Sequence, residues 1–380
     1  NMKITVNIAR VIVGLLFIFS GLVKANDPMG LSYKMQEFFE VWGWNFMNNY
    51  TLALSILMIA FEIVAGVAVI VGWRMKLFSW LLLLLIIFFT FLTGYAVLSG
   101  KIRTCGCFGD CIPLTAAQSF TKDLVLTALI IFIFINRKKI QPLFSLSISI
   151  MLLLLAVVFS FSFQWYVLRY LPVVDCLPYK IGNNIEEKMK APPGSHPDSL
   201  EITFTYKKDG KEVSFNANNF PDDFDDSLYQ FTGKKERVIR VGNDSPPIRD
   251  FSLVTPQGND STVSILQQKG YMLFLFVKDG FYLGRNQFVD YPLNFVMSYA
   301  QEKHMPLYVI TNSREVPDQI EAAVQDSTVH PAAVFMCDAV AIKTAARVNP
   351  TLYLLKDGTI VYKWPYAQLQ KAYDDLHSLK

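Results

Sequence analysis

The chain has 380 residues, of which 52% are hydrophobic and 14% aromatic, a composition that excludes an ordinary soluble protein. Charge is unevenly divided, because residues 1–170 carry 13 Lys/Arg and 6 Asp/Glu, whereas residues 171–380 carry 22 and 26. Composition therefore predicts a membrane half followed by a water-soluble half. We expect no nucleic-acid partner, since the sequence has no stripe of Lys and Arg with interleaved aromatic residues.

Five apolar segments are long enough to cross a bilayer, whose core requires about 20 mostly apolar residues per helix. They cover approximately residues 8–25, 51–72, 77–98, 119–136 and 143–170. The first segment ends at Lys24 without a small-residue cleavage site, so we interpret it as a membrane anchor and not as a removable signal peptide. The bilayer itself is thus an expected partner of the first half.

The short loops that carry basic residues fall on one side of the predicted bundle. These residues are Lys3, Arg10, Arg74, Lys76, Arg137, Lys138 and Lys139. Because positive residues favour the cytoplasmic side, and five helices place the two ends on opposite sides, residues after about 171 are expected to lie outside. We therefore predict a multi-pass protein of the bacterial inner membrane, with a cytoplasmic N-terminus and a periplasmic C-terminal domain.

Three of the five cysteines, Cys105, Cys107 and Cys111, lie within seven residues in the loop after the third apolar segment. Cys176 follows the last apolar segment and is predicted on the same outer side, where disulfides persist. A bond between Cys105 and Cys107 would close a small, strained ring, which favours easy reduction by thiol–disulfide exchange. We therefore predict that this pair is redox-active, with Cys176 or Cys111 communicating with a client protein.

Two other interpretations of these cysteines stay open at the level of sequence. They could form a structural disulfide that pins the loop, and Cys111 could pair with Cys107 instead of resolving a bond between Cys105 and Cys107. They could also bind a metal through three thiolates. Because all four histidines lie in the second half of the chain, a fourth ligand would then be Asp110 or Cys176. The redox interpretation, which we prefer, requires no metal.

Glu62 lies inside the second apolar segment, where a carboxylate is costly and normally faces a cavity or a partner. One interpretation is a proton relay or a contact with a bound quinone. The other is a structural hydrogen bond to a neighbouring helix. The sequence does not separate the two.

Three motifs are shared with a known group of membrane proteins. They are Arg10-x3-Gly14-x5-Ser20-Gly21-x2-Lys24-x2-Asp27-x2-Gly30, then Glu62-x3-Gly66, and Cys105-Gly-Cys-Phe-Gly109. Together they resemble the DoxX/MauE group of small four-helix membrane proteins over roughly residues 3–136. The resemblance implies a redox role, since MauE-like members are associated with periplasmic disulfide formation and DoxX-like members with quinone-linked or thiol-stress functions. By analogy with other membrane thiol oxidases, we expect the electron acceptor to be a quinone held between the helices.

Residues 246–380 contain strands alternating with helices in the order β-α-β-α-β-β, and Asn349-Pro350 stands just before one of these strands. This pattern resembles the thioredoxin fold, which implies a cis bond between Asn349 and Pro350 beside the active site. Such proteins carry Cys-x-x-Cys after the first central strand, but residues 278–284 contain no cysteine, and Cys337 is expected to be a buried thiol. We therefore expect no dithiol chemistry here, but a groove at Asn349 and Pro350 that holds a peptide or a partner protein.

The expected fold is an α-helical polytopic membrane bundle with a C-terminal α/β thioredoxin-like domain. Its expected parts are a DoxX/MauE-like four-helix domain (1–140), a fifth membrane helix with a stalk (141–175), a small β-rich periplasmic module (176–245) and the thioredoxin-like domain (246–380). The leading hypothesis is an inner-membrane redox protein that passes electrons between periplasmic protein thiols and a membrane quinone through Cys105 and Cys107. The alternative is a non-catalytic scaffold or assembly factor whose C-terminal domain binds a periplasmic or membrane partner protein.

Overall fold

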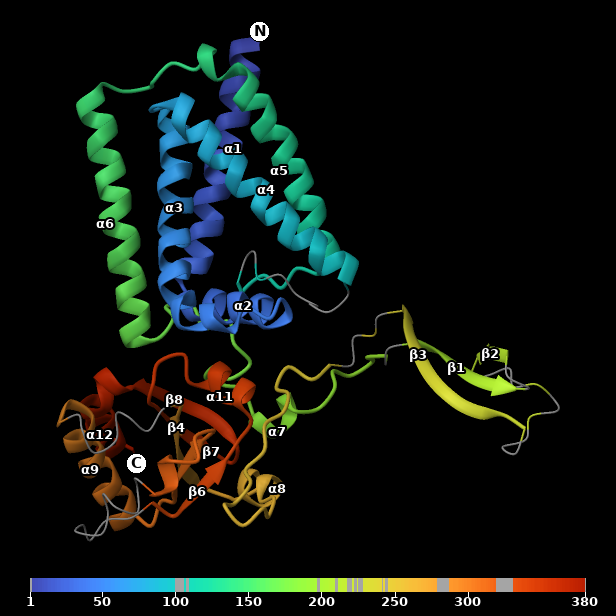
Figure 1. Cartoon of the computed structure of the whole chain (residues 1–380). Coiled ribbons are helices and arrows are strands. Elements are labelled where there is room, and N and C mark those ends of the chain that lie inside the picture. Colours follow the sequence, from blue (N-terminus) through green and yellow to red (C-terminus); the bar gives the residue numbers. More distant parts are fainter. Residues whose placement is uncertain are drawn as a thin grey trace.

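The computed structural model describes residues 2–99, 106, 109–196, 199–208, 211–216, 221, 224, 228–240, 242, 245–278, 287–318 and 331–379. A bundle of long helices, formed by the first 170 residues, stands end-on above a sheet domain formed by the C-terminal part of the chain (Figure 1). The N-terminus lies at the end of the bundle far from the sheet domain. A second, three-stranded sheet projects sideways from the connection between them.

Five described helices are long and apolar enough to cross a membrane, as the sequence predicts. They are α1 (Met2–Ala25), α3 (Thr51–Val71), α4 (Met75–Ser99), α5 (Ala116–Asn136) and α6 (Leu146–Tyr170). Large apolar side chains lie on the outside of the bundle, and Leu84 and Leu154 are each 59% exposed. An apolar exterior of this kind suits helices that are surrounded by lipid instead of water.

Helices α1 and α3 pack closely because two glycines face each other. A Cβ atom added to Gly14 would lie 2.8 Å from the carbonyl oxygen of Gly66, and one added to Gly66 would lie 2.8 Å from the carbonyl oxygen of Gly14. Neither position has space for a side chain, so the two backbones are in direct contact. This contact brings Lys24, at the end of α1, beside Glu62 in α3.

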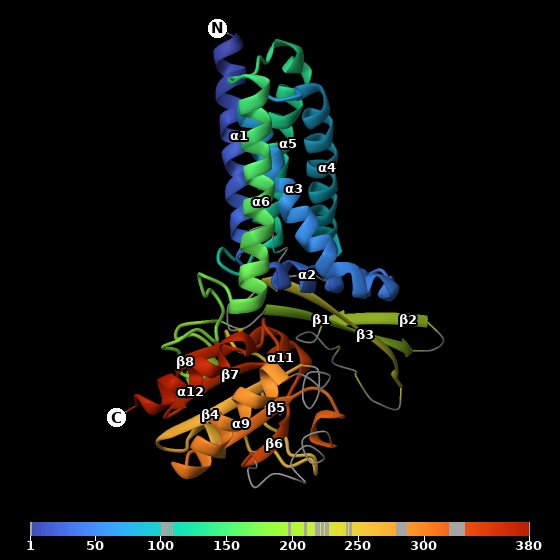
Figure 2. The same ribbon diagram turned by 90° about the vertical axis from the view of Figure 1, so that its left-hand side faces the viewer.

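Residues 26–50, which lie between the first two predicted membrane segments, contain helix α2 (Pro28–Val41) and the 3₁₀ helix η1 (Asn45–Tyr50). Asp27 caps α2, because its Oδ1 accepts a hydrogen bond from the backbone N–H of Gly30 at 3.0 Å. Figure 2 shows α2 lying across the end of the bundle that faces the sheet domain. Hydropathy alone does not reveal this helix, because its sequence mixes polar and aromatic residues.

The C-terminal domain contains one mixed five-stranded sheet in the order β6-β5-β4-β7-β8. The first three run parallel, and β7 pairs antiparallel with both β4 and β8. The strands are β4 (Tyr271–Val277), β5 (Leu307–Thr311), β6 (Ala333–Met336), β7 (Thr351–Lys356) and β8 (Thr359–Pro365). The bond between Asn349 and Pro350 is cis, which confirms that prediction. The helix expected between the second and third of these strands lies mostly outside the described residues.

Apolar clusters cover both faces of this sheet. Helices α9 (Gln287–Glu302) and α12 (Leu369–His377) pack on one face. The other face is covered by α8 (Thr262–Leu266), α11 (Ala339–Ala345) and the segment that contains α7 (Ile185–Lys188). This last segment precedes the small sheet in the chain, yet it contributes buried side chains to the core of the C-terminal domain.

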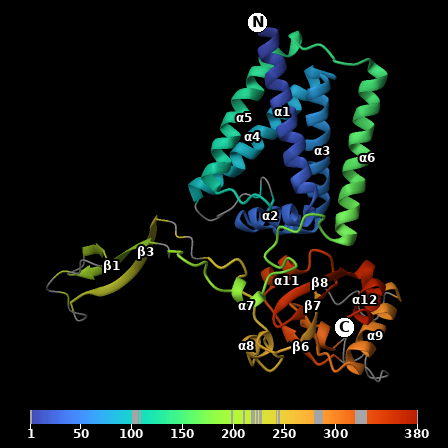
Figure 3. The ribbon, with the colours of Figure 1, turned by 180° about the vertical axis from the view of Figure 1, so that it is seen from behind.

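The small sheet is antiparallel and has the order β2-β1-β3. Its strands are β1 (Ser199–Lys208), β2 (Lys211–Asn216) and β3 (Gln230–Arg240). Aromatic rings pack against one another on it, and the Tyr206 ring lies 5.6 Å from both the Phe215 and Phe231 rings. Figure 3 shows this sheet extending away from the bundle and from the C-terminal domain.

Candidate functional site

A buried charged pair joins α1 to α3. Lys24 Nζ lies 2.5 Å from Glu62 Oε1, and the two side chains are only 3% and 1% exposed. The Ser20 hydroxyl donates a hydrogen bond to Glu62 Oε2 at 3.3 Å. Glu62 is thus buried as expected, but the sequence analysis did not pair it with Lys24, which it named only as the end of the first helix and as part of a shared motif. The four-residue spacing of Ser20 and Lys24, which places both on one helix face, is the signal that could have identified it.

Lys24 lines two cavities inside the bundle. The larger has a volume of about 420 Å³ and lies between α1, α2, α3 and α4. Its walls are mainly apolar, with the aromatic side chains Phe38, Phe39, Trp42, Phe61, Phe88 and Phe89. The smaller, of about 210 Å³, is lined by the polar side chains Ser20, Lys24, Glu62, Lys122 and Asp123 together with apolar residues. Lys24 therefore lies between two cavities, one with mainly apolar walls and one lined by charged side chains.

A second buried carboxylate that the sequence analysis missed faces the smaller cavity. Asp123 is 1% exposed, although it lies close to the start of α5. It accepts a hydrogen bond from the Thr93 hydroxyl of α4 at 3.0 Å and pairs with Lys122 Nζ at 2.9 Å. Glu62 is therefore one of two acidic groups buried within the described part of the bundle.

The loop that carries the predicted redox cysteines reaches the larger cavity through Gly106, which lines it. Cys105 and Cys107, the residues on either side of Gly106 in the sequence, lie outside the described residues. Gly106 itself has φ +65°, and a Cβ atom added to it would lie 3.0 Å from Cγ of Lys34 in α2. The absence of a side chain at Gly106 thus allows its backbone to lie close to α2, at the wall of the cavity.

The described end of the loop is held by a disulfide between Cys111 and Cys176, whose Cα atoms are 4.9 Å apart. The bond joins the loop to the segment that follows α6. Sequence reasoning left the partner of Cys111 open, and in the structure that partner is Cys176 instead of Cys107. Asp110 also has a partner, Arg347, so the two candidates for a fourth metal ligand are both engaged elsewhere.

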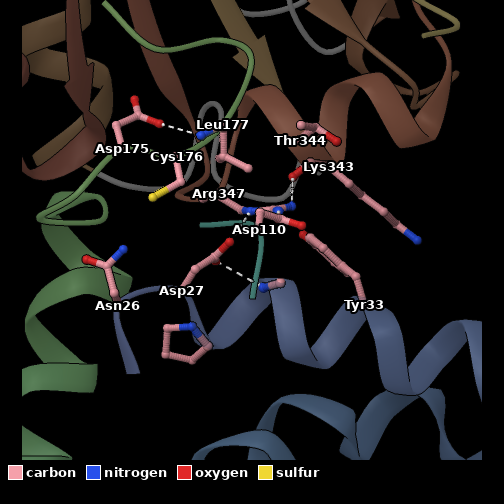
Figure 4. Close-up of polar contacts among 12 residues, drawn as sticks. Asn26, Asp27, Tyr33, Asp110, Asp175, Cys176, Leu177, Lys343, Thr344 and Arg347 are labelled. Carbon is pink, nitrogen blue, oxygen red and sulfur yellow. Dashed lines mark hydrogen bonds and ion pairs between the residues drawn. The ribbon is translucent and has the colours of Figure 1, made fainter. Parts of the chain in front are cut away.

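Arg347 lies three residues before the cis proline. Its side chain joins the C-terminal domain to the membrane half (Figure 4). Its Nε lies 2.8 Å from Asp27 Oδ2, and its Nη2 lies 2.7 Å from Asp110 Oδ2 in the cysteine loop. The side chain is 8% exposed. Burial by itself lowers the pKa of Arg347, but the two carboxylates outweigh it and raise the pKa above its ordinary value. Neither acidic partner was expected from the sequence.

Tyr33 of α2 is surrounded by cations of the C-terminal domain. Lys278 Nζ donates a hydrogen bond to the Tyr33 hydroxyl at 3.0 Å, while Lys343 Nζ lies 5.2 Å and the Arg347 guanidinium 5.3 Å from its ring centroid. Burial raises the pKa of Tyr33 to about 12. Burial and the neighbouring Arg347 lower the pKa of Lys278 to about 7, against the opposing charge of Asp27.

The predicted peptide groove lies next to this contact. Asn349 Oδ1 accepts a hydrogen bond from the backbone N–H of Lys278 at 2.9 Å, and Pro350 is buried. Lys278 contacts Tyr33 of α2, and Arg347 contacts Asp27, the N-cap of α2. The region beside the proline therefore faces the membrane half of the same chain. The peptide-binding role of Asn349 and Pro350 stays a prediction.

Comparison with known proteins supports part of the expected resemblance. Residues 2–136 match the family described as methylamine utilisation protein MauE, and residues 200–241 match a family described as a domain of unknown function (DUF8463). Among curated proteins, Protein TlpB of Flavobacterium psychrophilum is 26% identical over 128 residues, which cover 33% of this chain and 35% of that protein. The chain thus aligns with about a third of that relative's length. No solved structure matches the chain.

Replacement of Arg347 tests the contact between the two halves. Arg347→Met leaves the Asp27 carboxylate without its buried partner, which costs about 3–5 kcal/mol for a buried pair. We expect a loss of about 3 kcal/mol, the lower end of that range, because Asp110 is 44% exposed and regains water. Pulse proteolysis in urea measures the stability of the C-terminal domain in the full chain. Exposed Arg249→Met is the matched control, and equal stability of the two variants would contradict the assignment.

The lowered pKa of Lys278 predicts a pH dependence. Its pKa is about 7 in the folded protein and 10.5 ordinarily, so the unfolded chain binds more protons between these values. Stability therefore rises with pH through that window and is lowest below pH 7, where the buried lysine must carry a charge beside Arg347 and Lys343. We expect the stability of the wild type relative to Lys278→Met to be higher at pH 9 than at pH 6. A difference that is constant with pH would show that Lys278 is not desolvated.

Proposed function

We propose that this chain is a membrane thiol–disulfide redox protein in which Cys105 and Cys107 pass electrons between protein thiols outside the bilayer and a quinone within it. The observation that carries the proposal is the position of Gly106. This residue, which separates the two cysteines in the sequence, lines an apolar cavity inside the bundle. The described glycine between the two cysteines in the sequence thus lies at a space of a kind that could hold a lipid-soluble electron acceptor. The MauE match over residues 2–136 supports a redox role of this kind.

The cavity suits a quinone as a diffusing co-substrate in size and chemistry. Its volume of about 420 Å³ falls within the range of small-molecule sites, roughly 300–1,000 Å³. Aromatic and aliphatic side chains form most of its walls, and Lys24 contributes a buried ammonium group. A quinone accepts two electrons and two protons and leaves as a quinol.

The proposed exchange balances in two steps. A client dithiol attacks the Cys105–Cys107 disulfide through a mixed disulfide, so the client leaves oxidised and Cys105 and Cys107 become thiols. The pair then returns to a disulfide by giving two electrons and two protons to the quinone. Cys111 and Cys176 hold the loop through their own disulfide in this scheme and do not exchange with the client.

We assign the C-terminal domain to the thioredoxin-like group, as a domain that binds and has no thiol chemistry of its own. Three parallel strands, an antiparallel pair and the cis proline before β7 support this assignment. Its cysteine, Cys337, is buried, and burial raises the pKa of this thiol to about 11, so it is a poor nucleophile. Through Arg347 the domain contacts Asp110 of the cysteine loop, where it would present a bound client to Cys105 and Cys107.

The proposed orientation places the cysteine loop and the C-terminal domain in the periplasm of a bacterium, with the bundle in the inner membrane. Arg10 supports it, because its Nη1 donates a hydrogen bond to the Gln141 carbonyl at 3.1 Å, in the link between α5 and α6. This link, which follows Arg137, lies at the end of the bundle opposite the C-terminal domain (Figure 1). The basic residues thus gather at the proposed cytoplasmic end.

A non-catalytic scaffold is the second candidate function. The disulfide between Cys111 and Cys176 and the ion pair between Arg347 and Asp110 hold the loop from two sides, as a structural connection between the halves would require. In this alternative the C-terminal domain binds its partner whether or not Cys105 and Cys107 are present.

Replacement of the cysteine pair separates the two functions. We expect Cys105→Ser and Cys107→Ser to reduce quinone-dependent oxidation of a dithiol peptide to background, because neither variant can form the exchanging disulfide. The assay uses the full chain in lipid nanodiscs with a soluble quinone analogue and reports thiol loss. Cys337→Ser is the matched control and should keep wild-type activity. Undiminished oxidation by either serine variant would contradict the role of Cys105 and Cys107. No oxidation by the wild type, with partner binding that survives both substitutions, would favour the scaffold.

A further inference from the structure

The larger cavity is accessible from the side of the bundle. Helices α3 and α4 lie together near the turn that links them and diverge toward α2 (Figure 1). Two of the cavity's lining residues are also exposed on the bundle surface, Leu57 of α3 by 58% and Phe88 of α4 by 42%. The cavity therefore opens between α3 and α4, on a surface that would face lipid in the proposed membrane protein.

The end of the cavity nearest the C-terminal domain is closed by α2. Figure 2 shows this helix crossing the end of the bundle, and Phe38, Phe39 and Trp42 of α2 line the cavity. The Trp42 ring lies 5.7 Å from the Tyr95 ring of α4, which ties α2 to that helix. A molecule that enters sideways thus stays in an apolar space, separated from the aqueous side by an aromatic cover.

Lys24 is the polar recognition group on the inner wall. Its Nζ contacts Glu62 and lies 4.8 Å from the centroid of the Phe89 ring, and the side chain lines the cavity. An ammonium group has three N–H donors, and among the described residues Lys24 uses one of them, to Glu62, which leaves donor capacity for a ligand. A ligand with an apolar body and one carbonyl-type acceptor matches this combination, whereas a plain hydrocarbon chain has nothing to accept the bond.

We infer that this cavity is the quinone site, with the ring inserted between α3 and α4 and one of its carbonyl oxygens accepting a hydrogen bond from Lys24. The flat aromatic walls favour a ring over a flexible acyl chain, and Gly106 brings the cysteine loop to the same space. The apolar tail of the quinone extends through the lateral opening into the bilayer. This inference rests on the proposed function and adds the binding residues and the direction of access.

A photoreactive quinone tests the site. The full chain in nanodiscs is labelled with an azido-benzoquinone that carries a decyl tail, and labelled peptides are located by mass spectrometry. We expect labels on α2, α3 and α4. Because Lys24→Met alone leaves Glu62 buried without its cation, the decisive variant is Lys24→Met with Glu62→Gln. It should lose about tenfold to hundredfold in quinone affinity relative to Glu62→Gln alone, which also lacks the ion pair but keeps the Lys24 donor.

The lateral opening is tested with a matched pair of tryptophan variants. Leu57→Trp places a bulky indole ring at the opening and should reduce labelling, whereas Leu84→Trp, on the exposed surface of α4 outside the cavity, should not. Equal labelling of the two variants would overturn access between α3 and α4.

The outcomes distinguish this site from the function on which it rests. Labels outside the cavity, or unchanged affinity of the Lys24→Met/Glu62→Gln variant, would overturn the site while quinone-dependent thiol oxidation by the wild type continued. Displacement of the label by oleate as readily as by unlabelled quinone would assign the cavity to fatty acids and would also overturn it. If the wild type neither binds the probe nor oxidises the dithiol peptide, the proposed function itself fails.

Discussion

The ion pairs of one buried guanidinium connect the two halves of this protein. Asp27 takes part in two contacts at once, since its Oδ1 caps α2 through Gly30 and its Oδ2 accepts a hydrogen bond from Arg347. The same arginine reaches Asp110 in the cysteine loop. The start of α2, the loop and the C-terminal domain are therefore positioned by one side chain. An arginine suits this place, because its planar fork can donate to two carboxylates in different directions.

The cysteine loop has further contacts besides the one with Arg347. Gly106 lies against Lys34 of α2, Asp110 pairs with Arg347, and Cys111 is bonded to Cys176. The segment that contains Cys176 is fixed in turn, since Lys363 of β8 pairs with Asp175 at 2.7 Å and Asn26 exchanges two hydrogen bonds with Val174. In the proposed scheme, a client would reach this loop through the C-terminal domain, and a quinone would reach it through the lateral cavity.

The parts of the fold that depend on local pattern could be predicted from the sequence. Five long apolar helices and the strands β4 to β8 follow from hydropathy and from runs of β-branched and aromatic residues. Helix α2 was missed, because a 14-residue helix with a mixed surface gives no clear apolar period. The carboxylate of Glu62 was found, since a charge in an apolar run is conspicuous, but Lys24 at the end of such a run is not.

The contacts that assemble the candidate site were beyond sequence reasoning for a different reason. Arg347 lies 320 residues from Asp27 and 237 from Asp110, and 65 residues separate Cys111 from Cys176. Pairings over such separations depend on how α2 and the C-terminal domain pack, which a single sequence does not contain. The choice of Cys105, Cys107, Cys111 and Cys176 as one group came from their shared side of the membrane, and the structure divides that group by bonding the last two.

The central claim, that Cys105 and Cys107 exchange electrons with the membrane quinone pool, is tested most directly by their redox state in native membranes. Differential thiol alkylation and mass spectrometry would measure each cysteine with the pool oxidised and with the pool reduced. Our account predicts that Cys105 and Cys107 shift from disulfide to thiol as the pool is reduced, while Cys111 and Cys176 stay bonded. A Cys105/Cys107 pair that remains in one state under both conditions would contradict it.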